Sequence, residues 1–189
     1  MINGVETFDT GLDQCFNDYI IKQLYASSSW RVSYDEFYQH EKNSSYYVDN
    51  RLDDKFSDSG MLLCSYSIDQ PDHVNHFNFK LNVLANLIFS IIIKKQTKYV
   101  FKETRPTRFL WNYYNRASTG VLHKDEIKKN FGSIVYYLNT CDASTIIEDI
   151  KINCIAGTGA IFDSNSWHRG TGPADSKNKF MLNIVFSYE

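Results

Sequence analysis

Residues 108–139 read RFLWNYYNRASTGVLHKDEIKKNFGSIVYYLN, and this stretch decides the fold. It contains runs of aromatic and β-branched residues at about 108–115, 120–123 and 133–139, with Gly, Asn and Asp between them. Such runs predict short strands, because these side chains fit a pleated sheet and the intervening residues favour turns.

The same pattern continues on both sides of this stretch. Further strands are predicted at about 98–103, 147–152, 159–163 and 180–188. Six of the nine glycines lie between Gly120 and Gly172, which suits a chain that reverses direction often. Residues 98–189 are therefore predicted to form a double-sheet barrel or jelly roll.

The first 97 residues have a different character, because their clearest pattern is helical. Apolar residues three or four apart predict a helix through residues 12–24, capped by Thr10, and a second helix at about 79–95. A strand is predicted at about 61–68. Residues 30–58 show no sustained period, and we expect them to shape the entrance to a site.

We therefore expect one α+β domain, mainly β, that spans residues 1–189. Residues 1–97 would supply helical support and an entrance segment, and residues 98–189 would form the catalytic core. A chain of 189 residues and 22.0 kDa can bury a core without disulfides or structural metals.

Charge and cysteine content exclude several classes of partner. Lys plus Arg total 20 against 22 for Asp plus Glu, so the net charge of −2 favours neither nucleic acid nor an anionic membrane as partner. The four cysteines form no C-x-x-C pair, which predicts reduced thiols. The longest apolar run, 87–93, is too short to cross a membrane, and without a leader sequence we expect a cytoplasmic protein.

Three residues form a candidate metal site. His123 and Asp125 lie two positions apart at the end of a predicted strand, so their side chains share one face. His168 follows after further predicted strands, and a returning antiparallel strand would bring it beside the first pair. Two histidines and one carboxylate on one face form the triad that holds non-haem Fe(II) and leaves coordination positions open.

The order of motifs resembles the Fe(II)- and 2-oxoglutarate-dependent dioxygenases, in particular the prolyl-4-hydroxylase-like branch. The resemblance covers about residues 108–188, and it implies a double-stranded β-helix, which is a jelly-roll fold. The matching segments, in order, are Trp111–Tyr114, His123–Asp125, Val135–Asn139, Gly159–Asp163, Trp167–Gly170 and Lys179–Leu182. Where relatives often carry a Gly-Gly pair, this chain has residues 140–144, TCDAS, so it departs from the family pattern in this loop.

The resemblance also implies roles for individual residues. His123, Asp125 and His168 would be the catalytic iron ligands. Lys179 would bind the far carboxylate of 2-oxoglutarate, with Lys177 as a rival. Tyr114 would bind the same carboxylate; Tyr113 is the alternative, and only one of the two adjacent side chains can point inward.

The implied activity is that of an oxygenase that uses Fe(II), 2-oxoglutarate and O2. It would hydroxylate a peptidyl side chain or a small metabolite and release succinate and CO2. Two alternatives stay open: a non-catalytic cupin-like jelly roll that binds a small molecule, and a nucleic-acid dealkylase on the same scaffold. The net charge of −2 gives the dealkylase no electrostatic support. The sequence predicts no oligomeric state.

Overall fold

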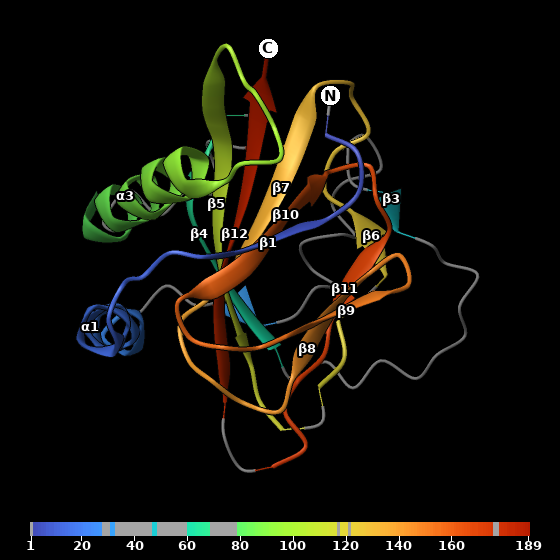
Figure 1. The fold of residues 1–189 in the computed structure, drawn as a ribbon. Coiled ribbons are helices and arrows are strands. Elements are labelled where there is room, and N and C mark those ends of the chain that lie inside the picture. The colour runs from blue at the N-terminus through green and yellow to red at the C-terminus, as the bar shows by residue number, and fades with distance from the viewer. Residues whose placement is uncertain are drawn as a thin grey trace.

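The computed structural model describes residues 2–27, 31–32, 47–48, 60–68, 79–116, 118–120, 122–175 and 178–189. In this part of the chain the strands form two antiparallel sheets. Helices α1 (Gln14–Tyr25) and α3 (Phe79–Lys95) lie on one side of the larger sheet, and the smaller sheet lies on the other side (Figure 1). The architecture is therefore α+β, mainly β, with a jelly-roll core and amino-terminal helices, as the sequence predicts.

The larger sheet carries most of the contacts between strands. Its strands are, in spatial order, β1 (Glu6–Asp9), β10 (Thr158–Asp163), β7 (Phe131–Tyr137), β12 (Lys179–Tyr188), β5 (Thr104–Tyr114), β4 (Gly60–Ser67) and β2 (Arg31–Val32). The smaller sheet contains β3 (Tyr47–Val48), β6 (His123–Lys124), β11 (His168–Gly170), β8 (Ser144–Ile147) and β9 (Ile150–Asn153).

The larger sheet is buried on both faces, and strand alternation gives each face its own core. The face toward the helices is strongly apolar, with Phe109, Trp111, Leu182, Ile184 and Phe186 packed among residues of α1 and α3. The face toward the smaller sheet holds a smaller cluster that includes Tyr114, Val135, Tyr137, Phe162 and Met181. The first core stabilises the fold, and the second surrounds the space in which polar groups collect.

Helix α3 has the bounds that its apolar spacing predicts, but α1 starts later than predicted. Asp13, not Thr10, is the N-cap, and its carboxylate accepts a hydrogen bond from the backbone N of Phe16 (2.8 Å). The Thr10 hydroxyl instead donates to the backbone O of Gly157 (2.7 Å), which ties the start of the helix to the turn before β10.

Two strand predictions are wrong in the described residues. The segment 98–103 forms no strand, because nearby backbone groups bond to side chains instead: the N of Tyr99 donates to Gln96 (2.9 Å) and the N of Thr97 to Glu6 (3.0 Å). The predicted strand 147–152 is a hairpin of β8 and β9, in which Glu148 turns the chain with φ of +50°.

The division into residues 1–97 and 98–189 stays a prediction. The amino-terminal part supplies more than helices, because β1 pairs with β10 and β4 pairs with β5 in the larger sheet. The expected entrance segment, residues 30–58, lies outside the described residues except for β2 and β3. Among the helices that the structure describes, none is long and apolar enough to span a membrane.

Phe186 tests the core between helices and sheet. Its side chain is fully buried and contacts the rings of Phe89, Phe101 and Tyr188. We expect Phe186→Ala to lower the free energy of unfolding by about 3–5 kcal/mol, because it leaves a cavity. The matched control is Val100→Ala, since Val100 is 97% exposed and should change stability by no more than ~0.5 kcal/mol. Urea unfolding measures both, and equal midpoints would contradict this account of the core.

Candidate functional site

Strands β6 and β11 place two histidines side by side on the inner face of the smaller sheet. His123 and His168 are direct partners in the antiparallel register, and their ring centroids lie 4.3 Å apart. Asp125 follows β6 by one residue, and its backbone N donates to the O of Ser164 (3.0 Å), in the turn after β10. The turn therefore fixes the carboxylate at the end of the short strand.

The three side chains converge on one point. One ligand atom from each of His123, Asp125 and His168 can be chosen so that all lie within 4.8 Å of one another. Asp125 Oδ1 lies 3.8 Å from His123 Nε2, and Asp125 Oδ2 lies 3.3 Å from His168 Nε2. All three residues are buried. The arrangement suits a metal ion, because two imidazoles and a carboxylate can bind it from one side.

The hydrogen bonding of His168 fits a metal ligand. Its Nδ1 lies 3.0 Å from the backbone O of Ser166, and since a carbonyl only accepts, Nδ1 carries the proton. In the neutral ring the lone pair is on Nε2, which is buried without a hydrogen-bond partner and lies 3.3 Å from Asp125 Oδ2. Two acceptors in such a contact are costly unless a cation or a proton lies between them.

The carboxylate of Asp125 is held by three polar side chains of the larger sheet. Arg108 Nη2 contacts Oδ1 at 2.6 Å, while Oδ2 accepts from Ser133 Oγ (2.6 Å) and Asn183 Nδ2 (3.1 Å). Burial alone would raise the pKa of Asp125, but the neighbouring His168, Arg108 and His123 bring it well below its usual range. Asp125 is therefore an anion at neutral pH.

A buried cation lies at the other end of the same space. Lys179 is fully buried, and its Nζ donates to the backbone O of Ser144 (2.7 Å) and Thr171 (3.3 Å) and to Thr145 Oγ1 (3.4 Å). These acceptors are neutral, and no carboxylate pairs with Lys179 among the residues that the structure describes. Burial lowers the pKa of Lys179 to about 8. An anion that entered the space beside Lys179 would meet an ammonium group that no carboxylate neutralises in the described residues.

Tyr114 lies directly opposite Lys179 in the register of β5 and β12, and Lys179 Nζ is 5.1 Å from its ring centroid. A Cβ at Gly170 would come within 2.9 Å of the Tyr114 hydroxyl, so only glycine permits this close approach. Tyr113 lies on the opposite face, with its ring 5.0 Å from that of Phe180. Lys177, the rival of Lys179, lies outside the described residues.

A cavity lies between the triad and the neighbours of Lys179 on β5, β8 and β11. Its lining combines the three candidate ligands with Tyr114, Thr145, Gly170, Asn112 and Asn183, and with the apolar Leu110, Val135 and Met181. The side-chain oxygens of Asn112 and Asn183 are buried without hydrogen-bond partners. The cavity thus offers free acceptors beside the metal site and a cation next to its far end.

The sequence interpretation missed four residues of this site: Arg108, Asn112, Ser133 and Asn183. Asn112, Ser133 and Asn183 each interrupt a buried apolar run, whereas Arg108 follows the polar, partly exposed start of β5. Buried polar groups in apolar runs need partners, so an isolated Asn there is a signal for a site. The signal was present in the sequence, but it does not say which strands lie together.

The similarity of this chain to known proteins lies in its structure and not in its sequence. No protein-family model and no curated protein matches the sequence. A viral collagen prolyl hydroxylase from Paramecium Bursaria Chlorella virus-1, solved with 2-oxoglutarate, matches at TM-score 0.54 and 12% identity over 97% of this chain and 96% of its own. A Pseudomonas putida prolyl-4-hydroxylase matches at TM-score 0.55 and 12% identity, over 98% and 93%.

A third structure is HygX from Streptomyces hygroscopicus, solved with nickel and 2-oxoglutarate; it matches at TM-score 0.60 and 8% identity, over 98% of this chain and 83% of its own. These matches define the class of fold, which is the double-stranded β-helix of the 2-oxoglutarate oxygenases. The double-stranded β-helix predicted from the sequence is therefore confirmed.

Arg108 tests the ion pair that anchors Asp125. We expect Arg108→Met to lower the free energy of unfolding by about 3–5 kcal/mol, because it leaves a buried carboxylate without its cation. The matched control is Arg105→Met on the same strand, since Arg105 is exposed and should have an effect near zero. Urea unfolding at pH 7 compares the two. If both variants lost the same stability, the buried pair would not be the anchor.

Proposed function

We propose that the protein is a non-haem Fe(II)- and 2-oxoglutarate-dependent oxygenase that hydroxylates its substrate and releases succinate and CO2. One observation carries the proposal: the buried triad of His123, Asp125 and His168 lines a cavity whose wall also includes Tyr114 and Thr145, and the buried Lys179 lies directly behind these two residues. A metal site that lines the cavity and a buried cation behind its wall fit a cosubstrate with an acid group at each end.

His123, Asp125 and His168 are the proposed iron ligands. The free lone pair of His168 Nε2 supports this role, and so does the fixed anionic state of Asp125. When bound, the iron supplies the oxygen chemistry, which side chains of proteins cannot supply alone. The contribution of the chain is to hold the ligands in place and to exclude water, since all three are buried.

Lys179 and Tyr114 are the proposed partners of the far carboxylate of 2-oxoglutarate. Lys179 supplies a charge-assisted hydrogen bond, and Tyr114, its direct neighbour across the sheet, supplies a hydroxyl next to Gly170. The free oxygens of Asn112 and Asn183 line the same cavity and can accept hydrogen bonds from a bound water or a substrate group. Together these groups would orient the cosubstrate toward the metal.

The proposed substrate class is a peptidyl side chain or a small metabolite. The Trichoplax adhaerens prolyl hydroxylase, solved with a peptide fragment of hypoxia inducible factor, matches this chain at TM-score 0.54 and 17% identity, over 98% of this chain and 83% of its own. HygX has also been solved with the small molecule hygromycin B. These neighbours support both halves of the substrate proposal equally.

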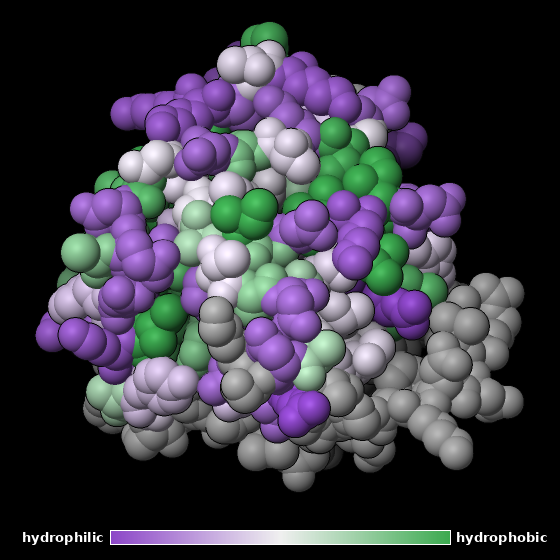
Figure 2. All heavy atoms as spheres, turned by 60° about the horizontal axis from the view of Figure 1, so that its bottom comes forward, coloured by the Kyte–Doolittle hydropathy of each residue, from purple (hydrophilic) through white to green (hydrophobic). Residues whose placement is uncertain are grey.

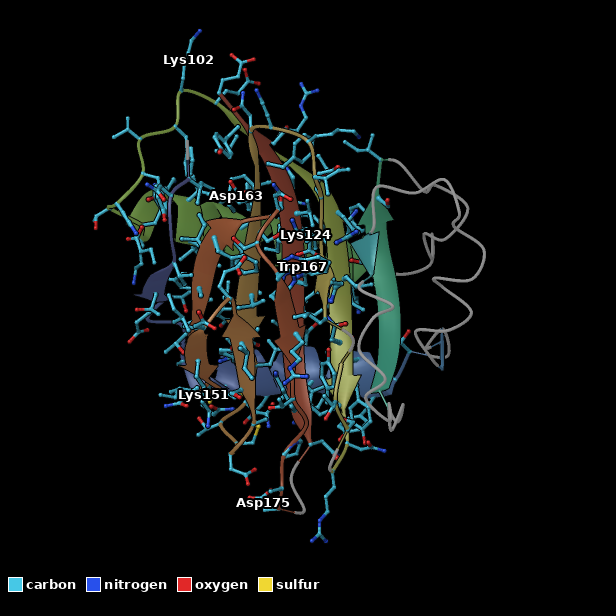
Figure 3. All side chains as sticks on the ribbon, turned by 90° about the vertical axis from the view of Figure 1, so that its right-hand side faces the viewer. Lys102, Lys124, Lys151, Asp163, Trp167 and Asp175 are labelled. Atoms are coloured by element: carbon cyan, nitrogen blue, oxygen red, sulfur yellow. The ribbon has the colours of Figure 1, made fainter. Side chains whose placement is uncertain are left out.

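The triad is tested by substitution. We expect His123→Ala, Asp125→Ala and His168→Ala each to abolish 2-oxoglutarate-dependent succinate formation and Fe(II) retention, because each removes a ligand. The matched control is Lys124→Ala. The Nζ of Lys124 lies 4.9 Å from the centre of the Trp167 ring on the outer side of the smaller sheet (Figure 3). This variant should keep both succinate formation and Fe(II) retention.

Succinate release and metal content are measured for each triad variant. A visible band that appears when 2-oxoglutarate is added to the iron-loaded protein without oxygen provides a second readout. Full turnover in any of the three triad variants would refute the assignment, and metal binding without the band or turnover would favour the non-catalytic jelly-roll module.

Lys179 is tested by the pH dependence of 2-oxoglutarate binding. Since its pKa is lowered to about 8, Lys179 carries its charge below pH 8 and loses it above. The affinity should be constant below pH 8, and above that pH the Kd should rise by about tenfold per pH unit, because binding must then take up a proton. Calorimetry between pH 7 and 9.5 measures the affinity and the proton uptake.

Two variants control this measurement. Lys179→Ala should weaken binding about 10- to 100-fold at pH 7, because a hydrogen bond to a charged group is lost, and it should remove the pH dependence. Lys177→Ala should leave both unchanged. If Lys177→Ala gave the loss instead, the carboxylate would bind to Lys177 and our assignment to Lys179 would be wrong.

A further inference from the structure

Two cysteines lie together beside the proposed anion site. Cys141 belongs to the loop after β7, and Cys154 follows β9 directly. The backbone N of Cys141 donates to the O of Cys154 (3.2 Å), and the N of Cys154 donates to the O of Ala143 (3.1 Å). Both thiols are free.

The backbone geometry of this pair suits a disulfide. The N of Cys141 and the O of Cys154 lie 3.2 Å apart, so standard bond lengths bring the two Cα atoms to within about 7 Å of each other. Disulfides span Cα separations of about 4.4–6.8 Å, so the pair is close enough for a bond between the two sulfurs.

The two thiols differ in reactivity. Cys141 is half-buried, and its interaction with the Cys154 thiol, with smaller effects of the Ala143 backbone and the Lys179 charge, lowers its pKa to about 7. Cys154 is buried, and its interaction with Cys141 together with burial raises its pKa. Thiolates are the reactive form, so Cys141 is the nucleophile and Cys154 is the resolving thiol.

Cys154 is connected to Lys179 through Asn139. The Cys154 Sγ donates to the backbone O of Asn139 (3.1 Å). The Asn139 side chain in turn holds both neighbours of Lys179: its Nδ2 donates to the O of Asn178 (2.6 Å), and its Oδ1 accepts from the N of Phe180 (2.8 Å). A change at the sulfur therefore reaches the start of β12, where Lys179 is held.

We propose that Cys141 and Cys154 form a thiol-oxidation site, which a peroxide closes to a disulfide that weakens anion binding at Lys179. The second half rests on the proposed function, because it takes 2-oxoglutarate as the anion. The loop after β7 lies at the lower end of the sheets in Figure 1, the end turned forward in Figure 2, where hydrophilic and hydrophobic residues mix on the surface. Cys141 is partly exposed, so a small polar oxidant can reach it.

The reaction balances with hydrogen peroxide as the oxidant. The Cys141 thiolate attacks one peroxide oxygen, the O–O bond breaks, and hydroxide leaves and takes up a proton to give water. Cys154 then attacks the sulfur of the Cys141 sulfenic acid, the S–S bond forms, the S–O bond breaks, and the released hydroxide takes the Cys154 proton. Two thiols lose two electrons, and one peroxide becomes two water molecules.

The disulfide removes the S–H group that donates to Asn139 and draws Cys154 toward the loop. The backbone O of Asn139 then loses its donor. The Asn139 side chain, which bonds to Asn178 and Phe180, shifts with it. Ser144, whose backbone O accepts from Lys179, lies three positions after Cys141 and is drawn by the same bond. Both effects change the position of the lysine without any contact between sulfur and ligand.

Mass spectrometry of the full-length protein tests the site itself. After treatment with one to a few equivalents of peroxide, the chain should lose two hydrogen atoms, and a non-reducing digest should yield a Cys141–Cys154 linked peptide that dithiothreitol separates. Cys141→Ser and Cys154→Ser should each abolish it. Cys15→Ser is the matched control, because Cys15 is exposed on α1, and it should form the link as the wild type does. Sulfinic acid at Cys141 without the link would overturn the proposal.

Calorimetry with 2-oxoglutarate and Mn(II), without oxygen, tests the coupling. The oxidised protein should bind 2-oxoglutarate about fivefold more weakly or worse, within the usual range of coupling between sites, and reduction should restore the affinity. Peroxide-treated Cys141→Ser protein, which cannot form the link but keeps the Cys154 donor to Asn139, should keep its affinity. An unchanged affinity in the linked protein would refute the coupling. Reduced protein that binds no 2-oxoglutarate would refute the proposed function, while the mass measurement still decides the thiol site.

Discussion

The buried carboxylate of Asp125 is the contact on which the arrangement of the site depends. It follows a strand of the smaller sheet, yet its partners Arg108, Ser133 and Asn183 come from β5, β7 and β12 of the larger sheet. A buried charge is costly, and only a full set of donors offsets that cost. The sheets must therefore pack in the one register that brings these donors together, and that register also presents His123 and His168 to the same point.

The sequence predicted those parts of the fold and site that depend on local pattern. Helix α3 and the long strand β12 carry strong periodicity, and both form close to the predicted bounds. The pairing of His123 with His168 could be predicted, because the H-x-D motif ends one strand and His168 begins an antiparallel strand. Strand alternation also left only one of Tyr113 and Tyr114 to face the cavity, and Tyr114 lines it. The role of each residue stays a prediction.

The remaining parts depend on contacts that no local pattern contains. Arg108 and Asn183 meet at Asp125 from positions 17 and 58 residues away, so the sequence shows them only as polar residues within strands. The segment 98–103 has strand-forming composition, but its backbone neighbours bond to Gln96 and Glu6 instead of a strand. In the same way, the turn at Glu148 splits a run of β-branched residues into two strands.

Lys179 shows how the fold gives up stability where it needs chemistry. A buried lysine among neutral acceptors is less stable in its charged form, which is why its pKa falls. An apolar side chain in its place would leave the backbone oxygens of Ser144 and Thr171 without this donor, so the ammonium group has a structural partner set of its own. Asn139 bonds to both chain neighbours of Lys179 and accepts from Cys154, so the position of this buried charge depends on the loop between β7 and β8.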